Sequence, residues 1–152
     1  MAHTVATRFF LLLSGIWLGG VIAVGYLVAP TLFATILDRQ FAGLVAGDVF
    51  RNTAITTLCT VTILLVLAQV FVSKGLDQYR IIRWYLMGIL ACTLIGACYL
   101  QPWMNELRHL ANGIPVMQSP YAQTFGMLHG ASSLLFMVEG LLGVSFFWKL
   151  TK

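Results

Sequence analysis

Charged residues are scarce in this chain. Only 9% of its 152 residues are Asp, Glu, Lys or Arg, whereas a soluble domain has about 25%. Hydrophobic residues make up 59% of the chain, and the mean hydropathy is +0.88. This composition excludes a water-soluble globule and indicates a single membrane domain, whose helices pack together in lipid.

The sequence also lacks the motifs of several functional classes. It has no phosphate loop, no nucleophile elbow and no HExxH metalloprotease motif. Its three cysteines, Cys59, Cys92 and Cys98, show neither a CxxC nor a zinc-type spacing, and in apolar runs they are typical of buried thiols. The net charge of +4 comes from residues at the ends of apolar runs, without a basic patch interleaved with aromatics. These absences argue against an enzyme and against a nucleic-acid partner.

Four apolar runs are long enough to cross about 30 Å of hydrocarbon. They cover residues 9–33, 53–72, 81–100 and 131–150. Gly75 after the second run predicts a helix end, and Asp77 is placed to cap the start of the third helix. Ser119 and Pro120 predict the start of the fourth helix. The chain is therefore predicted to be all-α, an integral membrane four-helix bundle with up-down topology.

The two outer loops are long enough to hold structure of their own. Residues 38–52 have apolar side chains at helical spacing, which predicts a short amphipathic helix on the outer membrane surface. The loop after the third run predicts a second short helix that ends at Asn112 and Gly113. Pro30 is predicted to kink the first span near its outer end.

Basic residues predict the orientation in the membrane. An even number of spans puts both termini on one side, together with the loop between the second and third spans. That side carries six basic residues, and the other side carries three. The six are Arg8, Lys74, Arg80, Arg83, Lys149 and Lys152. Both termini are therefore expected in the cytoplasm, with the protein in the cell inner membrane of a bacterium.

Two ionisable groups, His129 and Glu139, interrupt the fourth apolar segment. A charge at the centre of a bilayer costs at least about 2.5 kcal/mol, so such groups are functional candidates by default. Ser132 and Ser133 lie between them on the same broad helix face, which favours a polar track for protons or a ligand. The alternative is a protonated Glu139 that fixes the helix register. Its candidate partners on other helices are Thr62, Gln69 and Thr93.

A glycine motif marks the first span. Gly15 and Gly19 form a GxxxG pattern, and Gly20 follows it. Small residues let two helix backbones approach closely in lipid. The motif predicts close helix packing within the bundle, or alternatively self-association of two copies.

Metal and haem chemistry is a weaker alternative. Thioethers and imidazoles are ligands for copper, and His129, His109, Met104 and Met127 lie in or beside the outer third loop. No tight ligand spacing joins them. Haem between two histidines on facing helices would need a second copy of the chain, because the first three spans contain no histidine. No cofactor is therefore expected, with haem or copper as the alternatives.

Several stretches together resemble a known family. They are GIWLGG and VAPTLF in the first span, DRQFAGLVAGDVF before the second, PWMNELR after the third and FGMLHGASS at the start of the fourth. The chain resembles a bacterial four-helix membrane family of unknown function, which is similar to eukaryotic transmembrane protein 205. The resemblance implies four spans and a polar outer third loop. Its motif residues here are Pro102, Met104, Arg108, Phe125, His129, Gly130 and Ser132.

A more distant similarity is to the copper-resistance protein D group, which includes haem-linked membrane oxidases. This chain departs from that group by lacking a histidine in its first span. Haem and copper chemistry therefore does not carry over directly.

The sequence thus predicts a small non-enzymatic membrane protein, with an accessory, channel-like or transport-related role. The predicted site comprises His129, Arg108 and Glu106 at the outer mouth, then Ser132, Ser133 and Glu139 further in. Because one short chain offers little room for a pathway, a homo-oligomer or a larger membrane complex is expected. An assembly factor for such a complex is the third alternative.

Overall fold

Helices account for nearly all of the computed structural model, which describes residues 2–152 and, from Val5 onward, their side chains. No strand occurs in this described part, which confirms the predicted all-α fold. In chain order the elements are α1 (Ala2–Ala23), the π-helical segment η1 (Val24–Val28), α2 (Ala29–Thr35), α3 (Arg39–Ser73), α4 (Gln78–Ile95), the π-helical segment η2 (Gly96–Leu100), α5 (Gln101–Leu110), the 3-10 turn η3 (Val116–Gln118) and α6 (Ala122–Leu150).

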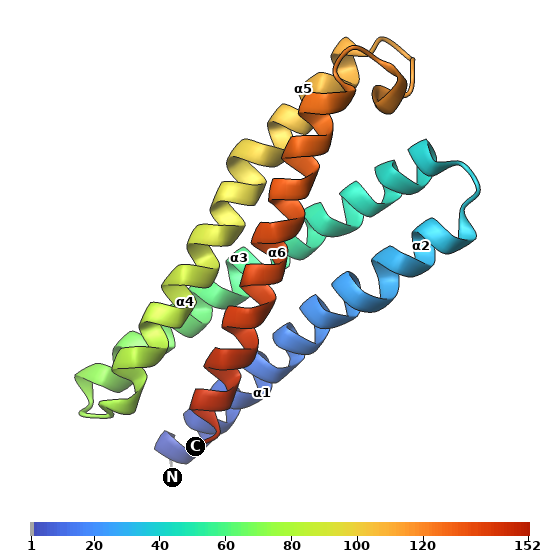
Figure 1. Ribbon diagram of the computed structural model, residues 1–152. Coiled ribbons are helices and arrows are strands. Elements are labelled where there is room, and N and C mark those ends of the chain that lie inside the picture. The colour runs from blue at the N-terminus through green and yellow to red at the C-terminus, as the bar shows by residue number, and fades with distance from the viewer. Residues whose placement is uncertain (1) are drawn as a thin grey trace.

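These elements join into four long helices that run up and down (Figure 1). Within the described residues, the four are long and apolar enough to cross a membrane: Val5–Thr35, Arg39–Ser73, Gln78–Leu110 and Ala122–Leu150. The two chain ends lie at the same end of the bundle (Figure 1). The chain is thus a multi-pass membrane protein with the predicted up-down order.

The segment before the second span differs from its prediction. Residues 38–52 were expected to form a separate surface helix, but they are the first part of the continuous helix α3. Asp38 caps this helix, since its Oδ1 accepts hydrogen bonds from the backbone N–H groups of Gln40 at 2.8 Å and Phe41 at 3.2 Å. No glycine or proline lies between Gly47 and Gly75. With a cap at its start and neither glycine nor proline between Gly47 and its end, the helix continues into the membrane span.

Two prolines have the same effect on the first and third spans, in the halves that lie away from the chain termini. Before Pro30, the backbone N–H of Ala29 bonds the Val24 carbonyl five residues back. Before Pro102, the N–H of Gln101 bonds the Gly96 carbonyl with the same spacing. A proline has no N–H and its ring crowds the preceding turn, and a wider π turn relieves both problems. The kink predicted at Pro30 is therefore a π-helical segment.

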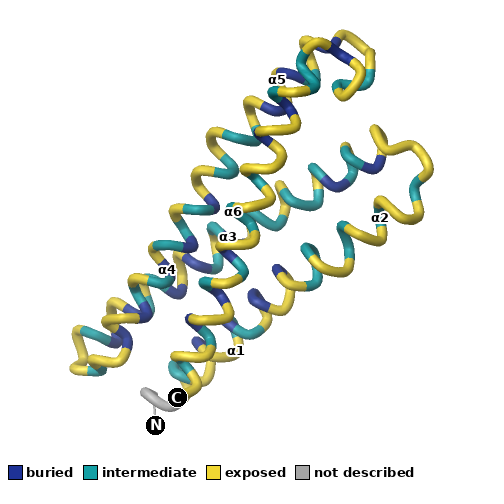
Figure 2. The backbone as a smooth tube through the Cα atoms, viewed as in Figure 1, coloured by how far each residue is buried: buried dark blue, intermediate teal, exposed yellow. Residues whose placement is uncertain are grey.

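The bundle has two apolar cores. At the end that holds the termini, aromatic rings from α1, α3, α4 and α6 pack edge to face, with the Phe10 and Tyr79 centroids 5.3 Å apart. A smaller cluster joins α5 and α6 at the other end and contains Met104, Leu107, Phe125 and Leu128. Buried residues line the inner sides of the helices, while outward positions are exposed, as expected for helices in lipid (Figure 2).

Close packing of α1 occurs at glycines other than the predicted motif. A Cβ atom on Gly143 of α6 would lie 2.8 Å from Leu18 and 3.2 Å from the Trp17 ring. In contrast, Gly19 and Gly20 have no atom of the described residues within 4 Å of such a Cβ. The large side chains Trp17 and Leu18 form the contact with α6, which turns these two glycines outward.

Gly15 is the third glycine of the motif. A Cβ there would meet the Phe147 ring of α6 at 3.5 Å, an ordinary contact. Within the described part of one chain, no other helix therefore packs closely against Gly19 or Gly20, and the predicted close packing is wrong at these two positions. Their role in self-association stays a prediction.

Candidate functional site

Glu139 lies in the middle of α6 and only 5% of its surface is exposed. The Oγ1 atom of Thr93 on α4 is 3.1 Å from its Oε2 atom, so a hydrogen bond joins α4 to α6. The hydroxyl of Thr57 on α3 also hydrogen-bonds this carboxyl group. Two neighbouring helices therefore hold the Glu139 side chain through neutral hydroxyls.

Trp17 extends this network to the first helix. Its indole Nε1–H donates to Thr57 Oγ1 at 3.0 Å, and both side chains are buried. All four long helices thus contribute one side chain to a hydrogen-bonded group in the middle of the bundle. We call Trp17, Thr57, Thr93 and Glu139 the central polar cluster.

The hydrogen atoms in this cluster can be assigned from the donors and acceptors. Thr57 accepts from Trp17, which leaves its own hydroxyl hydrogen for Glu139. Thr93 lies 2.9 Å from the Ile89 carbonyl, which can only accept a hydrogen bond. If Thr93 gives its single hydrogen to Ile89, the hydrogen between Thr93 and Glu139 comes from the carboxyl group. The arrangement therefore accommodates a neutral carboxylic acid with every group satisfied.

Within the described part of the chain, no basic group balances Glu139. Among the described residues, the ion pair found is Arg80 with Asp77, and no Lys, Arg or His pairs with the Glu139 carboxyl. The half-buried thiol of Cys92 on α4 interacts electrostatically with Glu139. An ionised carboxylate here would have to rely on hydroxyl groups alone.

A second group of predicted residues lies on α5 and α6 at the end of the bundle away from the chain termini (Figure 1). The Arg108 guanidinium lies over the Phe125 ring, with 5.1 Å from its carbon to the ring centroid. The His129 ring stacks on the same ring, at 6.4 Å between centroids and an interplanar angle of 3°. Arg108 also donates a hydrogen bond to Asn105 at 2.8 Å. The structure thus brings Arg108 and His129 together through Phe125.

Arg108 also lies beside α3. Its two terminal nitrogens are 3.8 Å from the position that a Cβ of Gly47 would take, and Asp48 interacts with it electrostatically. Glu106, the third residue of the predicted outer group, is exposed and is not joined to Arg108 by an ion pair within the described chain.

The predicted polar track is not continuous in one chain. His129 is exposed, and the Ser133 hydroxyl donates to the His129 carbonyl of its own helix at 2.9 Å. Ser132 is half-buried. About 15 Å along the helix axis separate His129 from Glu139. The structure therefore places these residues in two separate groups, one central and one at the outer end.

Comparison with known families gives one match. Residues 12–112 match the family model described as a domain of unknown function (DUF4149), which is more than half of the chain. The chain belongs to the DUF4149 family. Comparisons with curated proteins and with solved structures give no match. The resemblances to transmembrane protein 205 and to the copper-resistance protein D group rest on sequence motifs alone.

The matched part of this DUF4149 protein runs from α1 to just beyond α5. It includes Trp17, Thr57 and Thr93, and it ends before α6, which carries Glu139. The central polar cluster is therefore shared between the matched region and the helix that follows it.

The weak metal candidates of the DUF4149 chain are dispersed. Met104 is buried in the outer apolar cluster, whereas His109, Met127 and His129 are exposed. Across the described residues, no three side chains among His, Cys, Asp and Glu come together in a group that could hold a metal ion.

Of the three candidate partners of Glu139, the structure confirms Thr93. Gln69 instead accepts a hydrogen bond from Arg83, and Thr62 is exposed. Sequence reasoning missed Trp17 and Thr57. Their signal was present, since each places a polar group in the middle of an apolar run, where a partner is needed.

Proposed function

We propose that this DUF4149 protein is a non-enzymatic, transport-related membrane protein in which Glu139 carries and exchanges a proton. The observation behind the proposal is a buried carboxyl group that is hydrogen-bonded to hydroxyls from two other helices and has no basic partner in the described chain. Buried carboxyl groups in membrane helices typically serve as proton relays in pumps and transporters.

The two protonation states of Glu139 differ in the energy that each costs inside the bundle. A neutral carboxylic acid satisfies Thr57 and Thr93 without placing a charge in the bundle. Loss of the proton would leave a charge that costs at least about 2.5 kcal/mol in the middle of a bilayer. The charged form would therefore favour an arrangement of the four helices that lets water or a cation reach Glu139. In this way proton binding is coupled to helix packing.

We also propose how the chain is oriented in the membrane. Both termini lie in the cytoplasm and the membrane is the cell inner membrane, as supported by six basic residues at one end of the bundle against three at the other. The Arg108, Phe125 and His129 stack then lies near the outer surface. A second copy or a larger membrane partner completes the path between this stack and Glu139.

Proton flux into liposomes tests the function. Purified protein is reconstituted with a pH-sensitive dye inside the vesicles, and a potassium gradient with valinomycin drives proton entry. The wild-type protein should acidify the vesicles faster than protein-free liposomes, and Glu139→Gln should remove this excess rate. Glu106→Gln is the matched control, because Glu106 is an exposed carboxylate outside the central polar cluster.

Equal flux in the wild-type and Glu139→Gln proteins would contradict the proposal, as would wild-type flux equal to that of empty liposomes. A visible spectrum and a metal analysis of the same sample test the haem and copper alternative. Co-purification from native membranes with a stoichiometric partner tests the assembly-factor alternative.

A further inference from the structure

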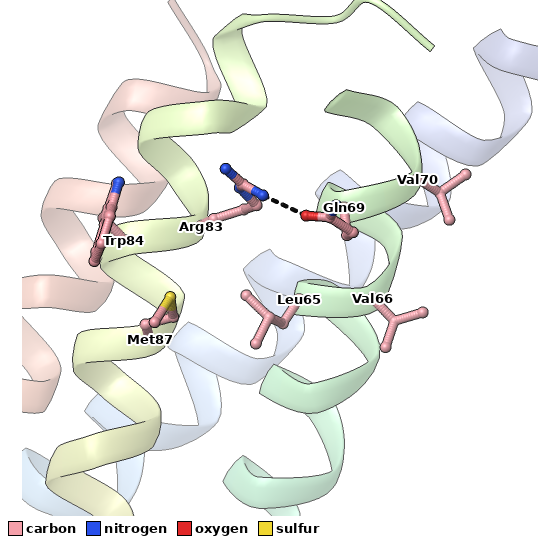
Figure 3. A pocket seen from close by; sticks show the side chains of 7 residues that line it. All are labelled: Leu65, Val66, Gln69, Val70, Arg83, Trp84 and Met87. Carbon is pink, nitrogen blue, oxygen red and sulfur yellow. Dashed lines mark hydrogen bonds between the residues drawn. The ribbon is translucent and has the colours of Figure 1, made fainter. Parts of the chain in front are cut away.

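A groove lies between α3 and α4 (Figure 3), near the end of the bundle that holds the chain termini (Figure 1). Its volume is about 470 Å³, and most of its lining is apolar. The apolar lining residues are Leu65, Val66 and Val70 on α3 and Trp84 and Met87 on α4. Val66, Trp84 and Met87 are exposed, so the groove opens on the lipid-facing side of the bundle.

Two polar side chains lie inside this apolar groove. Arg83 reaches from α4 toward α3, and its Nη1 donates a hydrogen bond to Oε1 of Gln69 (Figure 3). The Nε atom of Arg83 is buried and has no hydrogen-bond partner among the described residues. Since Arg83 also has no carboxylate partner in that part of the chain, its charge and one of its donors are left unsatisfied.

Arg80 provides a direct comparison three residues earlier. Its guanidinium lies 3.3 Å from the carboxylate of Asp77, and both side chains are well exposed. Arg80 is therefore paired and solvated, whereas Arg83 is half-buried and unpaired. An unpaired charged group in an apolar setting needs an anion nearby to be stable.

We propose that this groove binds one anionic phospholipid, with its phosphate on Arg83 and its acyl chains along the apolar walls. The planar guanidinium matches phosphate oxygens in geometry as well as in charge. The Nε donor and the remaining terminal donors of Arg83 serve the phosphate, and the Gln69 amide NH₂ adds a further donor. This site is independent of Glu139 and of the function proposed above.

The distance of the groove from the helix ends fits the position of a lipid headgroup. Gln69 lies one turn before the end of α3 at Ser73, and Arg83 lies just over one turn after the start of α4 at Gln78. Both are therefore roughly 6 to 8 Å from the helix ends. Trp84 is exposed at the same level, as is typical of the membrane–water interface. Basic pockets between membrane helices are known to recognise anionic headgroups.

The charge around the groove selects an anionic lipid over a zwitterionic one. Lys74 and Arg80 are exposed at the same end of the bundle. Because Asp77 already neutralises Arg80, Lys74 and Arg83 give the local excess of positive charge, which repels the cationic part of a phosphatidylcholine headgroup and attracts a net negative one. A soluble phosphate compound would gain nothing from the five apolar lining residues, whereas acyl chains cover them.

Native mass spectrometry of the delipidated protein tests this site. The protein is titrated with phosphatidylglycerol and, separately, with phosphatidylcholine of the same acyl chains. We expect one tightly held phosphatidylglycerol, and roughly tenfold weaker binding of it by Arg83→Gln because a charged hydrogen-bonding group is lost. Arg80→Gln is the matched control and should bind like the wild type, since its guanidinium is exposed and already paired.

A second variant keeps the test decisive if Arg83→Gln does not fold. Met87→Trp fills the groove and leaves Arg83 in place, so it should also lose the bound lipid. Equal binding of both lipids, or unchanged phosphatidylglycerol binding in the Arg83 or Met87 variant, would overturn the proposal. Displacement of phosphatidylglycerol by inorganic phosphate at a similar concentration would also overturn it, because the occupant would then be a soluble phosphate and not a lipid.

Discussion

The Thr93 hydroxyl lies 3.1 Å from Oε2 of Glu139 and joins α4 to α6 in the middle of the bundle. Thr93 is also within hydrogen-bond distance of the Ile89 carbonyl, and it has only one hydrogen to give. If Thr93 gives this hydrogen to Ile89, a proton on Glu139 completes the network. The same network reaches α3 and α1 through Thr57 and Trp17.

The packing of α1 on α6 predicts a large difference between two glycines of α6. Gly143→Ala should lower the free energy of unfolding by about 1–2 kcal/mol, because the added methyl group meets Leu18 and the buried Trp17 ring. Gly140→Ala is the control, since no atom of the described residues lies within 4 Å of a Cβ there. Thermal unfolding in mild detergent measures both. Equal stability of the two variants would show that α1 does not pack against Gly143.

The hydrogen bond from Trp17 to Thr57 predicts an energetic coupling between α1 and α3. In a double-mutant cycle with Trp17→Phe and Thr57→Val, the interaction energy should be roughly 1 kcal/mol. The cycle cancels the loss of indole volume and the separate loss of the Thr57 bond to Glu139. Denaturant or thermal unfolding of the four proteins provides the values. Additive effects of the two substitutions would mean that this hydrogen bond does not stabilise the protein.

The position of Arg108 over the Phe125 ring predicts that lysine cannot replace arginine there. Arg108→Lys should reduce the free energy of unfolding by about 1 kcal/mol, because the planar guanidinium is lost from the ring and from the surface of α3. Arg51→Lys, an exposed position on α3, should leave stability unchanged. If Phe125→Leu removed the ring and Arg108→Lys then still had its full effect, the stacking would not be the cause.

The fold could be predicted largely from the sequence, because four long apolar runs in lipid must satisfy their backbone groups as helices. The join between residues 38–52 and the second span was not predictable from apolar spacing. It depends on the Asp38 cap and on the absence of glycine and proline between Gly47 and Gly75. The π-helical segments before Pro30 and Pro102 could not be predicted from the sequence either, because a proline can also end or bend a helix.

The site was predictable in part. Glu139 was identified because a carboxyl group in an apolar run is costly, and Thr93 was identified because it is polar in the middle of a neighbouring span. The polar groups of Trp17 and Thr57 indicate a need for partners, but the sequence does not identify these partners, because they depend on the rotation of α1 and α3 about their axes. Tight packing at Gly143 fixes one of these rotations, and this contact comes from a helix far along the chain.

Infrared spectroscopy of the reconstituted protein at neutral pH tests the central claim most directly. The chain has five acidic residues, of which Asp38, Asp48, Asp77 and Glu106 are exposed and Glu139 is buried. The account predicts a C=O stretching band from one protonated carboxylic acid in the wild-type protein, and its loss in Glu139→Gln. If this band were absent from the wild type and Glu139→Gln instead lost intensity from the carboxylate bands, Glu139 would be ionised and the account would be contradicted.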